Sequence, residues 1–190
     1  MSISESDTES TMTREIDGAT SVLERTEALA EFFEAQAREA EDLGRLPLET
    51  VQQLKASGLV RLLQPREYGG YEAHPTDFAQ AVINVGSRCG SSGWVAGVVG
   101  VHPHGLAMGD PRILAELWGE DPDVWTSSPY APMGLARPVE GGFRFSGHWK
   151  FSSGTDASDW VIIGGLWRVR MEPPTAKTYA TSCCPAATMR

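Results

Sequence analysis

The sequence predicts an α+β fold, with an N-terminal helical bundle followed by a partial antiparallel β-barrel-like domain. Apolar residues recur at helical spacing through roughly the first 120 residues, and the period changes to two over roughly the next 45. Because helices precede strands rather than alternate with them, a Rossmann fold is excluded. The chain also contains no GxGxxG or Walker loop, so we do not expect it to bind NAD(P)H by itself.

Glycine and proline residues mark where the predicted helices begin and end. Gly44 stands where a C-terminal cap belongs, and Pro47 stands where the next helix starts. The segment from Trp94 to His102 is apolar on every side, so we expect this helix to be central and buried. The predicted helices cover residues 13–43, 47–57, 75–89, 94–102 and 111–118.

Alternating apolar residues predict short strands over the later part of the chain, with Gly141-Gly142 as a hairpin turn. The predicted strands cover residues 124–128, 136–140, 143–145, 148–151 and 160–163. The chain then divides into a disordered lead (1–12), a helical domain (13–120), a partial β middle domain (121–165) and a divergent tail (166–190). We expect the tail to be disordered, because it carries Pro173-Pro174 and shows neither a helical nor a strand period.

Composition excludes several classes of partner. The net charge of -9 argues against nucleic acid and against an anionic membrane, since both reward basic patches. No apolar run approaches the length of a membrane span, and the acidic N-terminal residues do not resemble a secretory signal. Three cysteines give no disulfide framework, so we expect a cytoplasmic protein.

Two hydroxyl–aromatic segments are the most informative local feature. The first, residues 126–130, reads Thr-Ser-Ser-Pro-Tyr, and the second, residues 149–154, reads Trp-Lys-Phe-Ser-Ser-Gly. Neutral hydroxyls beside flat apolar surface suit a flat heteroaromatic cofactor such as a flavin better than a phosphate or a metal ion. Serines that cap turns and aromatics that belong to strands would explain the same residues, so both interpretations stay open.

His102 and Trp94 share one predicted helix. His102-Pro103-His104 lacks a third ligand at defined spacing, so we expect no metal site. His102 is either a core histidine with satisfied hydrogen bonds or an acid/base group. Trp94 is either a core aromatic or a residue that stacks on a cofactor. No GxSxG elbow is present, so a hydrolase triad has no support.

The motifs taken together resemble a known family. The earlier ones resemble the N-terminal helical domain of the acyl-CoA dehydrogenase superfamily, and the later ones resemble its branch of two-component, flavin-dependent aromatic monooxygenases (oxygenase component). The later motifs are Cys89 to Val95, Gly100 to Pro103, Leu117 to Gly119, Tyr130 to Gly134, Ser146 to Trp149 and Phe151 to Gly154; the earlier ones run from Leu46 to Gly70. The resemblance covers roughly Ala28 to Gly165.

The resemblance implies a function and a set of site residues. It implies that a partner NAD(P)H-flavin reductase delivers reduced FMN or FAD, and that O₂ then supplies a hydroxyl group to a phenolic substrate. Positions matching Trp94, Ser128-Pro129-Tyr130 and Phe151-Ser152-Ser153 line the flavin in the family. Ser153 matches a catalytic hydroxyl near the flavin N5, and His102 matches the histidine that polarises the phenol. Members of the family are homo-tetramers.

The chain departs from that family after Gly165. Members continue into a C-terminal four-helix domain, which we expect to be missing here through a frameshift or premature stop, leaving an exposed sheet edge. Two alternatives remain beside the monooxygenase. One is an acyl-CoA dehydrogenase, against which the altered run from Ser128 to Gly134 argues, and the other is a non-catalytic remnant or interaction module.

Overall fold

The computed structural model describes residues 18–167 and, as backbone, 178–185. The chain divides into two compact units between Val124 and Trp125. The predicted disordered lead, 1–12, lies outside the described residues. Among the described residues, no helix combines the length and the apolar character needed to cross a membrane.

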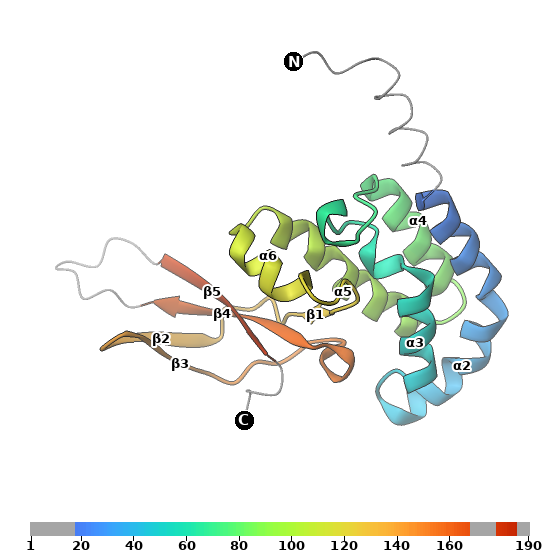
Figure 1. Cartoon of the computed structure of the whole chain (residues 1–190). Helices are drawn as coiled ribbons and strands as arrows, with labels where there is room; N and C mark the ends of the chain where they lie inside the picture. Colours follow the sequence, from blue (N-terminus) through green and yellow to red (C-terminus); the bar gives the residue numbers. More distant parts are fainter. Residues whose placement is uncertain (1–17, 168–177, 186–190) are drawn as a thin grey trace, which may run out of the picture. The chain divides into compact units, whose positions relative to one another are not determined.

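The first unit is helical (Figure 1). Residues 18–28 form a helix, so the single helix predicted over 13–43 is interrupted at Leu29. Glycines in the left-handed conformation, which lacks a steric penalty only for glycine, end α2 at Gly44 and α3 at Gly58. The longer helices are α2 (Ala30–Leu43), α3 (Leu48–Ser57), α4 (Pro75–Gly86), α5 (Gly90–Ala107) and α6 (Pro111–Trp118).

Helix α5 is longer than the sequence predicts, because neither its glycines nor Pro103 ends it. Gly93 lies so close to α4 that an added Cβ would stand 2.3 Å from the Gly86 Cα. A glycine is therefore needed there for the close approach of two helices rather than for a break between them. Burial also differs from the prediction on one face, because Trp94 is 65% exposed although Ala96 and Val99 are fully buried.

The second unit is a mixed sheet rather than the antiparallel sheet predicted (Figure 1). Strands β2 (Gly134–Val139) and β3 (Gly142–Ser146) form an antiparallel hairpin, and β4 (Trp160–Trp167) pairs antiparallel with β5 (Thr178–Pro185). However, β1 (Thr126–Ser127) and β2 both run parallel to β4. Because β5 pairs with β4 along its whole length, β1 and β2 must share the opposite side of β4.

Three local predictions in the second unit differ from the structure. The hairpin turn is Glu140-Gly141, with Gly141 at φ 78°, because Val139 pairs with Gly142. Residues 148–151 are not a strand, since Phe151 has a positive φ that an extended strand does not allow. Residues 178–185 form β5, although the sequence predicts disorder over 166–190. Both sides of β4 are consequently paired, and within the described residues the sheet stays open, because β3 pairs only with β2 and β5 only with β4.

Candidate functional site

A chain of three hydroxyl groups joins the two hydroxyl–aromatic segments inside the second unit. Ser127, at the end of β1, is fully buried, and its Oγ lies 3.1 Å from Thr155 Oγ1. Thr155 Oγ1 in turn lies 2.7 Å from the Ser152 carbonyl oxygen and 2.6 Å from Ser152 Oγ. A hydroxyl has one proton and two acceptor lone pairs, so Thr155 can donate to Ser152 while it accepts from Ser127. Residues 126–130 and 151–155 are therefore neighbours in space.

Each segment carries an aromatic residue in the left-handed backbone conformation. Tyr130 has a φ of 53° and is 75% exposed, and Phe151 has a φ of 61° and is 92% exposed. Bulky residues rarely adopt this conformation, and it persists only where the surrounding structure holds it. The Tyr130 N–H donates to Ser128 Oγ over 3.0 Å, which helps to hold its turn. Packing of the two rings in the protein core does not explain this backbone conformation, because both rings are exposed.

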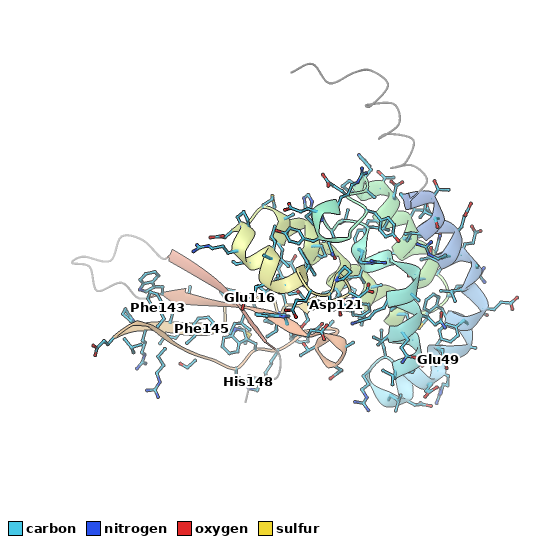
Figure 2. The ribbon with its side chains drawn as sticks, in the orientation of Figure 1. Glu49, Glu116, Asp121, Phe143, Phe145 and His148 are labelled. Atoms are coloured by element: carbon cyan, nitrogen blue, oxygen red, sulfur yellow. The ribbon has the colours of Figure 1, made fainter. Side chains whose placement is uncertain are left out.

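Trp149 has a different role from its neighbour Phe151. Its indole Nε1–H donates to the Gly164 carbonyl over 2.8 Å, and its ring packs beside Phe145 on β3, which Figure 2 labels. An added Cβ on Gly134 would stand 2.4 Å from the Trp149 ring. Trp149 therefore covers glycines of the sheet, so residues 149–154 contain one tryptophan that packs on the sheet and one phenylalanine that is exposed.

In the first unit, His102 is buried within α5 and Trp94 is exposed near the start of the same helix. Burial lowers the pKa of His102 to about 4, because a charged imidazole loses its hydration there. His102 is therefore neutral at pH 7. A neutral imidazole carries one acceptor nitrogen, which is what the acceptance of a hydrogen bond from a hydroxyl requires.

The predicted site residues thus form two groups, one in each unit. Ser128, Pro129, Tyr130, Phe151, Ser152 and Ser153 belong to the second unit, and Trp94 and His102 belong to the first. Ser128 and Pro129 are buried, whereas Ser152 and Ser153 are partly exposed. No cluster of three or more metal-ligating side chains occurs within residues 18–167.

Sequence reasoning missed Thr155 and Asp159. The Trp125 N–H donates to Asp159 Oδ2 over 3.0 Å, and the Asp159 and Trp160 N–H groups both donate to the Trp125 carbonyl. These bonds fix the start of β1 beside β4. The signal in the sequence is Gly154-Thr155, which follows the second segment directly: Gly154 turns the backbone at φ 81°, and the turn brings Thr155 back onto Ser152.

A family model described as "Acyl-CoA dehydrogenase, N-terminal domain" matches residues 23–110. Over these residues, the chain belongs to the family of acyl-CoA dehydrogenase N-terminal domains. It is 50% identical over 145 residues to a pigment production hydroxylase of Rhodococcus erythropolis, covering 76% of this chain and 37% of the relative. It is 43% identical over 143 residues to HsaA, the oxygenase subunit of a flavin-dependent monooxygenase from Rhodococcus jostii, covering 75% of this chain and 37% of that subunit.

Among solved structures, the fold resembles a 3-HSA hydroxylase from Rhodococcus sp. RHA1. The TM-score is 0.83 at 38% sequence identity, and the match covers 90% of this chain and 44% of that one. The chain therefore spans less than half the length of the relatives that it matches.

The residues of the second unit fit a flavin ring. The hydroxyls of Ser128 and Ser152 are neutral donors and acceptors, and Tyr130 and Phe151 add exposed aromatic surface from the same two segments. An isoalloxazine ring has a flat apolar face and an edge of neutral carbonyl and nitrogen groups. Such a ring takes hydrogen bonds on its edge and aromatic contacts on its face.

Proposed function

We propose that this chain contributes a flavin-binding wall and a phenol-polarising histidine to the oxygenase component of a two-component, flavin-dependent aromatic hydroxylase. The observation that carries the proposal is that a hydroxyl chain joins two segments, each of which carries an exposed aromatic residue in the left-handed conformation. Two aromatic residues that keep a strained backbone conformation although their rings are exposed favour a role in contact with a ligand. The relatives named above, a flavin-dependent oxygenase subunit and a hydroxylase, support the same function.

The flavin-facing residues in this proposal are those of the second unit. Phe151 and Tyr130 offer ring surface to the flavin, and Ser128, Ser152 and Ser153 offer neutral hydrogen bonds to its edge. When bound, reduced FMN or FAD would supply the electrons and the O₂ chemistry of hydroxylation. Neutral hydroxyls suit this task, because they can orient a polar edge without offering a strong acid.

His102 has the protonation state that phenol activation needs. Its lowered pKa leaves the imidazole neutral at pH 7, so it can accept the proton, or the hydrogen bond, of a phenolic hydroxyl. Electron density on the phenol ring rises as the proton moves toward the imidazole, and a ring with higher electron density accepts a hydroxyl group more readily. Trp94, exposed on the same helix, offers a further aromatic surface.

The partners follow from the same proposal. An oxygenase component depends on a reductase that supplies reduced flavin, and the substrate class is a phenol. The homo-tetramer, which only the resemblance implies, and the cytoplasmic location expected from the sequence stay predictions. Acyl-CoA dehydrogenase activity and a non-catalytic interaction role are the competing functions.

Anaerobic titration with reduced FMN, and separately with reduced FAD, tests the proposal on the chain itself. We expect saturable quenching of tryptophan fluorescence and retention of the flavin on gel filtration. Addition of O₂ and a simple phenol, such as 4-hydroxyphenylacetate, then tests for a catechol product. Saturable binding without product identifies a binding module, reduction of bound FAD by an acyl-CoA identifies a dehydrogenase, and no binding of either reduced flavin overturns the proposal.

A further inference from the structure

We propose that Thr155 is a positioning residue: its hydroxyl ties Ser127 to Ser152 and thereby holds the Phe151 ring where it contacts the flavin. This inference rests on the proposed function, since it concerns how the same site is held. Thr155 itself is not assigned a contact with the flavin. Its effect passes through Ser152, which directly follows Phe151 in the chain.

The geometry places Thr155 between the two segments. Its Oγ1 lies within 3.1 Å of Ser127 Oγ on one side and within 2.7 Å of both Ser152 oxygens on the other. The Thr155 N–H also donates to the Ser152 carbonyl, at 3.3 Å. One residue therefore fixes both the backbone and the side chain of Ser152 against β1.

The first segment is a firm support for this tie. Ser127 is fully buried and pairs with Val161 on β4, and the carbonyl of Trp125 accepts backbone hydrogen bonds from the N–H groups of residues 159 and 160. A buried hydroxyl without a partner is costly, so Ser127 Oγ favours the arrangement in which Thr155 is within reach. The tie therefore transmits the rigidity of the sheet to the loop that carries Phe151.

The second segment needs such a support. Phe151 is 92% exposed and holds a φ of 61°, so little packing of its own ring keeps it in that conformation. Its conformation must then be held through its chain neighbours. Thr155 is also suited to the task by its branched Cβ, which restricts the rotation that would move Oγ1 away. Ser158 Oγ donates to the Gly154 carbonyl over 2.9 Å and holds the turn on the other side of Thr155.

Three variants test the tie. Thr155→Val keeps the shape and removes the hydroxyl, Thr155→Ser keeps the hydroxyl, and Thr50→Val is the matched control. Thr50 is fully buried, and its Oγ1 has no hydrogen-bond partner among the described residues. Thr155→Val loses the side-chain bonds to both Ser127 and Ser152, and we expect it to raise the Kd for reduced FMN about fivefold, an effect of the order that a lost hydrogen bond produces. Thr155→Ser should restore most of the affinity, and Thr50→Val should leave it unchanged.

A double-mutant cycle with Phe151→Ala separates positioning from general stability. If Thr155 acts through Phe151, Thr155→Val weakens binding much less in the Phe151→Ala background. A purely structural role would instead lower the melting temperature and weaken binding equally in both backgrounds. Equal effects, or a Thr155→Val variant with the affinity of the parent chain, overturn the proposal.

Hydrogen exchange in the absence of flavin makes the two proposals distinguishable. Thr155→Val should accelerate exchange of the amides of residues 151–155, whereas Thr155→Ser should not. Unchanged exchange shows that no tie exists, whatever the flavin result. Faster exchange in a chain that binds no reduced flavin overturns the proposed function, and with it the positioning role, while the tie itself stands. If Thr155→Val does not fold, Ser127→Ala removes the other partner of the same hydrogen bond and takes its place in every measurement.

Discussion

The buried imidazole of His102 makes the stability of the chain depend on pH in a way that can be calculated. Its pKa falls from 6.5 to about 4 on folding, because burial removes water from the charged form. The unfolded chain then binds the proton more tightly than the folded chain, so the free energy of unfolding rises with pH between about 4 and 6.5. A shift of this size corresponds to about 3 kcal/mol, fully present above pH 6.5 and lost as the pH falls to 4.

Replacement of His102 by Gln isolates this contribution. Glutamine has no charge at any of these pH values, so the His102→Gln variant keeps every other titration of the chain and loses only that of residue 102. Urea unfolding followed by tryptophan fluorescence, from pH 4 to pH 8, gives the free energy of unfolding for both chains. We expect the free energy of unfolding of the parent, relative to that of the variant, to fall by about 3 kcal/mol as the pH falls through this range.

Two results would refute this reasoning. Parallel stability curves for the parent and His102→Gln would show that residue 102 does not titrate differently on folding. An NMR titration in which the His102 ring shows an ordinary pKa near 6.5 would show that burial does not exclude the charged form. Either result would also show that burial is not what keeps His102 neutral.

Two packing predictions follow from the glycines and from Trp149. Gly93→Ala should destabilise the chain by about 1–3 kcal/mol, because its Cβ would meet the α4 backbone at Gly86. Gly105→Ala on the same helix meets nothing within 4 Å and should stabilise the chain by about 0.5–1 kcal/mol. Thermal unfolding of both variants checks this pair of predictions, and equal melting temperatures would contradict it. Trp149→Phe should cost about 1–3 kcal/mol, because the Gly164 carbonyl loses its donor. Urea unfolding of this variant should show the loss, and a change below about 0.5 kcal/mol would contradict the role of this hydrogen bond.

The helical unit could largely be predicted from the sequence, because caps and apolar stripes are local signals. Gly44 and Gly58 end helices where expected. The ends of helix α5 could not be predicted correctly, since whether a glycine ends a helix or lies inside it depends on what packs against it. Gly93 faces Gly86 of α4 at close range, and only the packed structure shows that this glycine belongs inside a helix.

The sheet was harder to predict, because strand pairing is not local. The hairpin of β2 and β3 follows from its turn, but the parallel pairing of β1 and β2 with β4 joins residues far apart in the sequence. Strand β5 carries no alternating pattern that would distinguish it from a loop, and its partner β4 determines it.

The site followed from the sequence in its residue types but not in its geometry. The two hydroxyl–aromatic segments were expected to contribute together, and the structure joins them through Thr155, which no motif singled out. Trp149 and Phe151 lie two residues apart in the sequence, yet one covers glycines of the sheet and the other is exposed. A left-handed backbone at a phenylalanine leaves no signature in the residue types, so only the structure reveals it.

The central claim is that the exposed rings beside the hydroxyl chain contact a flavin. The most direct test compares the Kd for reduced FMN of Phe151→Ala with that of Phe143→Ala, an exposed phenylalanine on β3 that packs against Trp167 (Figure 2). We predict severalfold weaker binding for Phe151→Ala and unchanged binding for Phe143→Ala. Equal affinities in the two variants and the parent chain would contradict the claim.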